Sequence, residues 1–256
     1  MSPDLPSEAL WLLTGAAAFS AGVLNAIAGG GSFLTFPALV FAGVPPLAAN
    51  ATSAMAVSPG YLGSVLGFRS ELQTLPRALL QREVAIAALG GLIGAGLLLV
   101  TPARVFSGLV PWLLLLATAL FAAGPWLARR NSGQGHPAWR LPGLMGVAVY
   151  GGYFNGGLGI LLMALYTLTG ESRLNTVNAL KNLNSFVLSL LSVAAFAVAG
   201  AIVWPQALWM MALATLGGWA GARLAKRLPV RWVRWVRWLV IGTGLVMSVV
   251  FFARAG

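Results

Sequence analysis

The sequence predicts an all-α polytopic membrane protein built from two inverted repeats of about five helical segments each, eight to ten segments in total. Hydrophobic residues make up 59% of the 256 residues and charged residues only 8%, with a mean hydropathy of +0.85. Such a composition suits a bilayer rather than a water-exposed surface. The apolar runs are long and do not alternate with polar residues, which favours helices over barrel strands. An internal repeat is the third observation.

The repeat relates two glycine-rich stretches. Residues 22–53 read GVLNAIAGGGSFLTFPALVFAGVPPLAANATS, and residues 152–182 read GYFNGGLGILLMALYTLTGESRLNTVNALKN. Matched positions are Gly22 with Gly152, Asn25 with Asn155, Asn50 with Asn178, Gly90 with Gly217, and Gly94 with Gly221. The offset drifts only from 130 to 127 residues along these pairs, which indicates one structural unit present twice.

Each copy is expected to contain five apolar segments. They are 9–28, 31–44, 47–68, 83–101 and 104–128, then 142–156, 157–170, 174–203, 205–224 and 231–253. The second segment of each copy has about 14 residues, fewer than the roughly 20 needed to cross a bilayer. We therefore expect a half-helix or one arm of a re-entrant hairpin at these two places.

The predicted organisation is a first transmembrane repeat over 1–130, a cytoplasmic linker over 131–141 and a second repeat over 142–256, forming one integrated membrane domain. The first ten residues, MSPDLPSEAL, contain two acids and no Lys or Arg. They lack the basic region of a cleaved signal peptide, so the first apolar stretch is expected to remain as a helix.

Charge placement predicts the orientation. Thirteen of the 16 cations lie in four places that are expected to be cytoplasmic: residues 69–82, 129–140, 173 and 223–237. Only Arg104 and Arg254 then lie outside, and Lys181 falls within a segment. Five segments per copy would make the second copy enter from the opposite side, with a substrate site near the midplane where the copies meet.

The runs NAIAGGGSFLTFPAL at 25–39 and VPPLAANATS at 44–53, with their degenerate second copy, resemble the sulfite exporter TauE/SafE family of membrane transporters. The resemblance covers nearly the whole chain. It implies a bacterial inner-membrane permease from a family associated with export of sulfite and small organosulfur anions, and it does not specify the cargo. The second copy departs most from the first around residues 171–181.

The glycine breaks are the first candidate substrate site. Their residues are Asn25, Gly29, Gly30, Gly31 and Ser32 in the first copy and Asn155, Gly156 and Gly157 in the second. A glycine break exposes backbone N–H groups at the start of the next helix, where an anion is favoured. The alternative is that these glycines only permit close packing or a kink. A nucleotide-binding loop is excluded because no G-x-x-x-x-G-K-[ST] occurs.

Polar residues at the start of each third segment extend the candidate site. They are Asn50, Thr52 and Ser53, and then Asn178, Lys181 and Asn182. Amides and hydroxyls can replace part of an anion's hydration without burying an unpaired charge. Asn178, Asn182, Ser185, Ser189 and Ser192 recur at steps of four and three, which places them on one helical face. Serines on membrane helices also serve as packing residues, so a path-lining role and a packing role both stay open for them.

Lys181 is the sharpest single signal, because a cation inside a membrane segment is costly unless it snorkels or finds a partner. We expect it to attract or bind an anion. The alternatives are snorkelling to the cytoplasmic face or pairing with Glu171. No Asp, Glu or His is expected deep in a segment, with Glu83 placed at the edge of the basic loop. A proton relay needs such groups, so potential-driven uniport is favoured, although Glu83 leaves a proton route open.

Two further motifs are interpreted as structural. The glycine pairs at 90 and 94 and at 217 and 221 are expected to pack helices. The Arg and Trp run at 231–238 is expected to anchor a helix among anionic lipids. The formal charge of +11 follows from topology rather than from nucleic-acid binding, and the absence of cysteine excludes disulfides and thiolate metal sites.

The predicted function is export of a small anion, sulfite or an organosulfonate, across the bacterial inner membrane, with no cofactor or metal. The expected partners are the anionic substrate and the lipid bilayer, without nucleic acid, and a homo-oligomer is left open. The alternatives are a proton- or cation-coupled importer, a non-transporting scaffold, and an intramembrane lipid-modifying enzyme. The enzyme is disfavoured because no embedded His, carboxylate pair or Cys supplies its chemistry.

Overall fold

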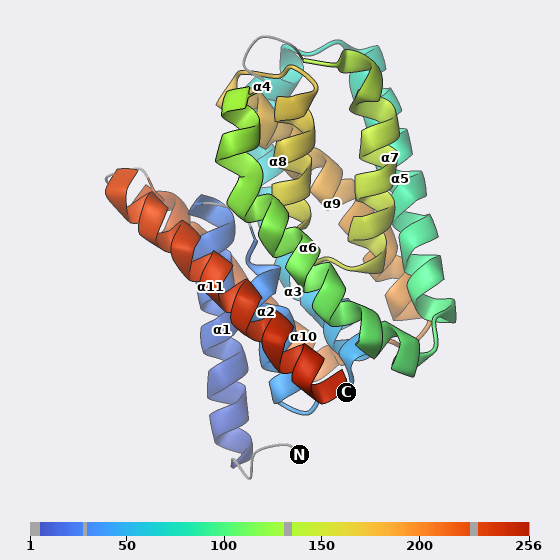
Figure 1. Cartoon of the computed structure of the whole chain (residues 1–256), viewed down its shortest axis with the longest axis vertical. Coiled ribbons are helices and arrows are strands. Elements are labelled where there is room, and N and C mark those ends of the chain that lie inside the picture. The colour runs from blue at the N-terminus through green and yellow to red at the C-terminus, as the bar shows by residue number, and fades with distance from the viewer. Residues whose placement is uncertain (1–5, 28–29, 131–134, 226–229, 256) are drawn as a thin grey trace.

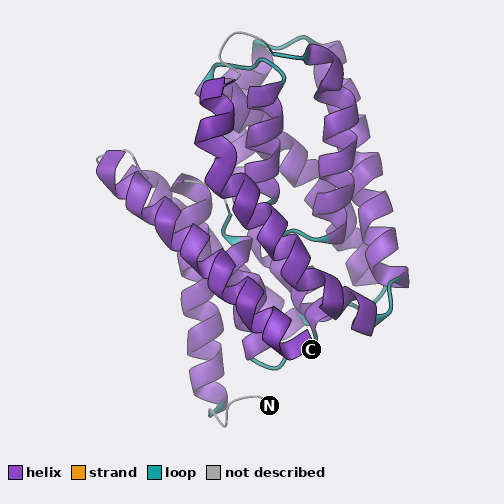
Figure 2. Cartoon of the chain, in the orientation of Figure 1, coloured by secondary structure: helices purple, strands orange, loops and turns teal. Residues whose placement is uncertain are grey.

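The computed structural model describes residues 6–27, 30–130, 135–225 and 230–255. Over these residues the chain is helical, and no strand occurs among them (Figure 2). The helices of the first half are α1 (Ser7–Ile27), α2 (Ser32–Phe41), α3 (Pro46–Gly67), α4 (Arg69–Gln73), α5 (Arg77–Val100) and α6 (Ala103–Arg130). Those of the second half are η1 (Pro137–Trp139), α7 (Arg140–Tyr153), α8 (Leu158–Leu168), α9 (Leu174–Val198), α10 (Trp204–Ala225) and α11 (Val230–Ala255).

The helices follow the predicted apolar segments, with one difference that matters for function. Helix α5 begins at Arg77, six residues before the predicted start, because the helix continues back through the polar sequence after Pro76. Proline suits such a position since its fixed φ is compatible with a helix start and its missing N–H is not needed there. As a result, Glu83 lies nearly two turns inside α5 rather than at its edge.

The outer surface is apolar, as expected for a protein that faces lipid. Four helical stretches are long and apolar enough to cross a membrane within the described part of the chain: Ser7–Asn25, Arg77–Val100, Ala103–Ala123 and Leu174–Val198. Large aliphatic side chains are exposed on several helices, including Leu12 at 71%, Val100 at 78% and Val198 at 92%. Exposure on this scale is costly in water and favourable in a bilayer.

The short helices α2 and α8 fold back instead of crossing. Helix α8 has 11 residues, about 16 Å of helix. Its end lies beside the start of α7, because the backbone N–H of His136 donates to the carbonyl of Leu168 at 3.3 Å. Figure 1 shows the links before α7 and after α8 at the same, upper end of the molecule. Helices α7 and α8 therefore form a re-entrant hairpin.

Helices α1 and α2 make the corresponding turn in the first half. The start of α1 lies beside the start of α10, since the indole N–H of Trp209 donates to the carbonyl of Trp11 at 3.1 Å. The start of α3 is at the same end, because the backbone N–H of Val203 donates to Oγ1 of Thr52 at 3.0 Å. Since α1 and α3 both begin there, the ten-residue α2 must return to the end from which α1 started.

The two halves exchange packing partners. Helix α1 packs on α10, whereas α7 packs on α5, so the first of the five apolar segments of each half lies against the fourth segment of the other. Helices α3 and α9 pack on each other near the centre, and α6 packs on α11 (Figure 1). Figure 1 also shows that α1 begins at the lower end and α7 at the upper end, while α6 rises and α11 descends.

Glycines allow these helices to approach closely. A Cβ added to Gly90 would lie 2.6 Å from Cβ of Ala148 on α7, and one added to Gly217 would lie 3.0 Å from Cα of Phe19 on α1. Such distances leave no room for a side chain, so the packing interpretation of the glycine pairs agrees with the structure. Gly90 of α5 lies against Ala148 of α7 and Gly94 lies against Tyr153, so the contacts advance in the same direction along both helices and the helices run parallel.

Candidate functional site

The two glycine breaks meet inside the molecule. The hydroxyl of Ser32, at the start of α2, donates to the backbone carbonyl of Asn155 at 3.0 Å. The side-chain Nδ2 of Asn50 on α3 donates to the carbonyl of Tyr153 at 3.0 Å, and its Oδ1 accepts from the backbone N–H of Asn155 at 3.3 Å. We call these four residues, Ser32, Asn50, Tyr153 and Asn155, the break junction. It joins segments more than a hundred residues apart in sequence.

The carboxamide of Asn155 is the most unusual group at the break junction. The residue is 2% exposed, yet neither Oδ1 nor Nδ2 has a hydrogen-bond partner among the described residues. An amide buried without partners costs about 1–3 kcal/mol. Because the backbone of Asn155 is fully engaged while its side chain is not, a donor and an acceptor are left available at the centre of the molecule.

The glycines shape the two breaks. Gly30 has φ of +93° and Gly157 has φ of +77°, left-handed values that other residues adopt with strain. Gly157 is also crowded, because an added Cβ would lie 2.7 Å from Cβ of Ala117 and 3.3 Å from the ring of Phe33. Gly29 lies outside the described residues. Both breaks are therefore required by the backbone path, whatever they bind.

Several candidate residues near the breaks form hydrogen bonds within the protein. Oδ1 of Asn25 accepts from the backbone N–H of Gly31 at 2.8 Å, and the carbonyl of Gly156 accepts from the hydroxyl of Tyr150 at 2.8 Å. Asn25 lies in the last turn of α1, whereas Asn155 lies in the link just after α7, so the two matched asparagines lie on opposite sides of a helix end. An N–H that already donates to Asn25 is not available to a ligand in this conformation.

Thr52 and Ser53 hold neighbouring elements in place. Oγ1 of Thr52 accepts from the backbone of Val203, as described above, and the hydroxyl of Ser53 lies 2.6 Å from that of Thr35 on α2. Both residues are buried. Their hydrogen bonds give them a structural role in this conformation.

The polar face of α9 forms a second group, which we call the α9 stripe: Asn178, Lys181, Asn182, Ser185, Ser189 and Ser192. Lys181 is 6% exposed, and its Nζ donates to Oδ1 of Asn178 at 3.2 Å. Lys181 therefore neither snorkels into solvent nor pairs with Glu171, whose carboxylate contacts Arg173 instead at 3.4 Å. A buried cation with one neutral partner is suited to an anion.

The serines of the α9 stripe divide into two kinds. The hydroxyls of Ser185 and Ser189 are buried and have no hydrogen-bond partner among the described residues. The hydroxyl of Ser192 donates to the carbonyls of Gly91 at 3.0 Å and Leu188 at 2.7 Å. Ser192 is thus a packing residue, whereas Ser185 and Ser189 extend a line of available polar groups along α9. Asn182 is buried on the same helix.

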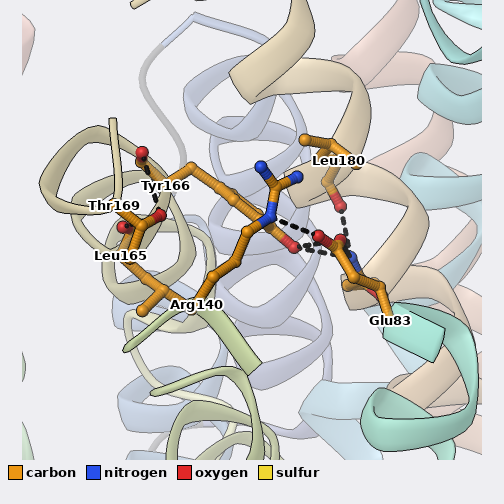
Figure 3. Close-up of polar contacts among 7 residues, drawn as sticks. Glu83, Arg140, Leu165, Tyr166, Thr169 and Leu180 are labelled. Carbon is orange, nitrogen blue, oxygen red and sulfur yellow. Dashed lines mark hydrogen bonds and ion pairs between the residues drawn. The ribbon is translucent and has the colours of Figure 1, made fainter. Parts of the chain in front are cut away.

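A buried carboxylate overturns one expectation from the sequence. Glu83 is fully buried, and its Oε1 accepts from Nε of Arg140 at 2.6 Å. Its Oε2 accepts from the hydroxyl of Tyr166 at 2.8 Å and from Nδ2 of Asn184 at 2.9 Å. Figure 3 shows Arg140 and Tyr166 both directed at Glu83. The expectation that no acid lies deep in a segment is wrong, because α5 begins earlier than its apolar stretch.

The Glu83 cluster, comprising Glu83, Arg140, Tyr166 and Asn184, is close to charge-neutral. The guanidinium of Arg140 also lies over the ring of Tyr166, 5.2 Å from its centre. The ion pair and these additional hydrogen bonds give both carboxylate oxygens of Glu83 a partner, which offsets part of the cost of burying them. Sequence reasoning missed the cluster because Arg140 was assigned to the linker. The available signal was Tyr166 on α8 and Asn184 on α9, two polar residues that do not belong to the α9 stripe.

An open pocket lies at the end of the molecule where α9 begins. Its volume is about 630 Å³, and its lining includes Glu71, Thr74, Arg173 and Asn175. Arg173 and Asn175 are both exposed there. The pocket leads to the N-terminal end of the helix that carries Lys181 two turns further on. The side chains of the Arg and Trp run at 231–237 lie outside the described residues.

An all-helical, lipid-facing chain with paired re-entrant breaks and buried polar groups at their meeting point has the architecture of a polytopic membrane transporter. The sequence model of the family described as Sulfite exporter TauE/SafE matches residues 14–251. The chain belongs to this family.

Its relatives carry transporter names. The chain is 31% identical over 214 residues to a "Probable membrane transporter protein" of Haemophilus influenzae, covering 80% of this chain and 81% of the relative. It is 29% identical to "Probable membrane transporter protein ORF9" of a Sinorhizobium species, over 82% and 80% of the two chains. It is 28% identical to "Probable membrane transporter protein YfcA" of Escherichia coli K12, over 82% and 77%. No solved structure gives a significant match.

Proposed function

We propose that this protein exports a small anion, sulfite or an organosulfonate, across the bacterial inner membrane by potential-driven uniport. The observation that carries the proposal is the unpartnered carboxamide of Asn155, buried where the two breaks meet. The family description names sulfite export. Neutral donors together with one buried lysine suit a small oxyanion, because they replace its hydration without holding it too strongly.

The orientation follows from the described cations. Arg69, Arg77, Arg82, Arg140 and Arg173 all lie at the end that carries α4 and the start of α9. By the positive-inside rule this end is cytoplasmic. Arg104 lies near the start of α6, at the opposite end. The protein would then be a multi-pass inner-membrane protein with both described termini on the outer side.

In this orientation the polar groups follow one another from the cytoplasmic end towards the middle of the membrane. Arg173 and the open pocket come first, and Lys181, Ser185 and Ser189 follow at steps of about 6 Å along α9. Helix α7 is 14 residues long, so the break after it lies about 20 Å below the cytoplasmic end. That depth is well within a hydrocarbon core about 30 Å thick. An anion could pass from Lys181 towards Asn155.

We also propose that the halves are inverted repeats, with the candidate site between them. The exchange of packing partners and the opposite directions of α1 and α7, and of α6 and α11, support this relation. Transporters of such design place the substrate where broken helices of the two copies meet. The boundaries at 130 and 142 and a homo-oligomer stay predictions.

Uniport is supported by the contacts of Glu83, the only carboxylate that lies beyond the first turn of a long apolar helix in the described part of the chain. Arg140, Tyr166 and Asn184 donate to its two carboxylate oxygens, so neither oxygen is left free to join a chain of proton carriers. A membrane potential that is negative inside drives an anion outward, with about 2.3 kcal/mol per charge for each 100 mV. Export then needs no coupled ion, and we propose transport rather than catalysis as the activity.

Counterflow in proteoliposomes tests the proposal, using sulfite, sulfoacetate, thiosulfate, sulfate and chloride as candidate substrates. We expect sulfite or a sulfonate to be exchanged, and Asn155→Ala to lose that exchange. Thr118→Ala is the matched control, because Thr118 is also buried but bonds only to its own helix at Leu114. Strict dependence on a proton gradient would refute uniport, and equal loss in both variants would refute the role of Asn155.

A further inference from the structure

The helices that pack most closely do not belong to the same half of the sequence. Helix α5 makes its extensive contacts with α7 and α9, although all of its neighbours in sequence belong to the first half. Helix α10 likewise packs on α1 and α3. We call α1, α2, α3 and α10 the first body, and α5, α7, α8 and α9 the second body.

Backbone contacts hold each body together. In the second body, a Cβ on Gly152 would lie 2.9 Å from Cα of Gly91, and one on Gly91 would lie 2.9 Å from Cα of Leu188. In the first body, a Cβ on Gly22 would lie 2.6 Å from the backbone nitrogen of Gly218. Helices at such distances are packed without intervening side chains, so separating them would cost much of their contact.

The Glu83 cluster adds an electrostatic interaction that links the helices of the second body to one another. Glu83 comes from α5, Arg140 from α7, Tyr166 from α8 and Asn184 from α9. All four helices of the body therefore contribute one residue to a single buried network (Figure 3). Breaking this network would leave a buried charge without its partner, which is strongly unfavourable.

The boundary between the bodies is closely packed by apolar side chains, but no ion pair crosses it among the described residues. Helices α3 and α9 pack across it, and the break junction spans it through three uncharged hydrogen bonds from Ser32, Asn50 and Asn155. Candidate site residues lie on both sides: Ser32 and Asn50 in the first body, Asn155 and Lys181 in the second. Neutral hydrogen bonds exchange more easily with a polar ligand than a buried ion pair does.

We propose that Glu83 is a positioning residue for transport: it ties α5 to α7, α8 and α9, so that this four-helix body moves as a unit against the first body along the α3–α9 boundary. The inference rests on the proposed function, because it describes how the same site would open. It assigns the moving parts to swapped bodies rather than to residues 1–130 and 142–256. Movement of the sequence halves would instead separate α5 from α7 and break the Glu83 cluster.

Distances between spin labels distinguish the two kinds of motion. The chain has no cysteine, so spin labels attach only to the two cysteines that are introduced in each variant. Lipid-exposed leucines provide them: Leu92 of α5 and Leu190 of α9 in the second body, and Leu12 of α1 and Leu208 of α10 in the first. None of these residues belongs to the candidate site.

In lipid nanodiscs without ligand and with sodium sulfite, we expect narrow, unchanged distances for L92C/L190C and for L12C/L208C. The pair L12C/L92C lies within one sequence half but across the two bodies, and its distance should be broad or should shift. A constant L12C/L92C distance with a changing L92C/L190C distance would overturn the proposal. Constant distances in all three pairs would overturn it as well.

Glu83 is tested separately on the same samples. In Glu83→Gln we expect the L92C/L190C distribution to broaden without ligand and the maximal rate of sulfite counterflow to fall about tenfold or more, with little change in the half-saturating concentration. Adding Arg140→Gln should narrow the distribution again. An unchanged distribution in Glu83→Gln would refute the role of Glu83, whereas absent counterflow in the unsubstituted protein would refute only the sulfite assignment.

Discussion

Removing either partner of the buried ion pair is expected to destabilise the protein, and by unequal amounts. Glu83 is fully buried, whereas the side chain of Arg140 is 16% exposed. Arg140→Gln leaves a buried carboxylate with only neutral donors, which is expected to cost about 3–5 kcal/mol. Glu83→Gln leaves a guanidinium that keeps some solvent and the ring of Tyr166, so we expect a smaller cost of about 2–3 kcal/mol.

The double variant Glu83→Gln with Arg140→Gln makes the test decisive. With no charge left in the cluster, it should be less destabilised than Arg140→Gln alone, because neither partner is then an unpaired buried ion. Unfolding of the purified protein in detergent, followed by circular dichroism during denaturant titration, measures all three variants. Additive losses in the double variant would refute the assignment of Glu83 and Arg140 as a coupled pair.

Substitutions at four other positions test the structure. Lys181→Ala is expected to abolish anion export while protein levels hold, and Lys181→Arg to retain part of it, because the α9 stripe needs its positive charge; undiminished flux in the alanine variant would disprove this. Gly94→Ala should cost about 1–3 kcal/mol, since its Cβ would lie 2.6 Å from the backbone nitrogen of Tyr153. Gly96→Ala is the control, because Gly96 lies on the same helix with open space around it; the variant should be neutral or stabilised by up to about 1 kcal/mol. Similar unfolding midpoints for Gly94→Ala and Gly96→Ala would contradict the close packing of α5 on α7. Tyr166→Phe should lose about 1.5–3 kcal/mol of stability, because the hydroxyl that donates to Glu83 is removed. The half-saturating sulfite concentration should stay unchanged. A large rise in that concentration would instead place Tyr166 in the substrate site.

The helical fold could be predicted because its cause is local. Long apolar runs in a bilayer must satisfy their backbone groups internally, so each run becomes a helix wherever glycine, proline or charge does not interrupt it. The shortness of the segments at 31–44 and 157–170 predicted helices that do not cross. Whether they span or fold back depended on contacts such as that between His136 and Leu168, which no local pattern reports.

The candidate site could be predicted only in part. Composition and repetition singled out Asn155 and Lys181, and the structure shows both buried with unsatisfied or weakly satisfied polar groups. The same pattern could not separate Ser185 from Ser192, because their difference lies in whether a neighbouring carbonyl is within reach. Periodicity fixes the face of a helix and does not identify what packs against it.

Glu83 shows most clearly where prediction from the sequence failed. Hydropathy placed the start of its segment where the apolar residues begin, but a helix continues for as long as its backbone is satisfied, so α5 carries six further residues at its N-terminal end. Its partner Arg140 lies 57 residues away at the start of another helix. Only the tertiary pairing of α5 with α7 brings these charges together, and the apolar faces of both helices are compatible with several neighbours.

Efflux of sulfite from proteoliposomes under an imposed potential tests the central claim most directly. With the cytoplasmic side made negative by potassium and valinomycin at constant pH, the unsubstituted protein should move sulfite to the opposite side, faster as the potential grows, while Asn155→Ala should show no more than background flux. Sulfite movement that ignores the potential, or that is equal in Asn155→Ala, would contradict anion uniport through the junction of the two breaks.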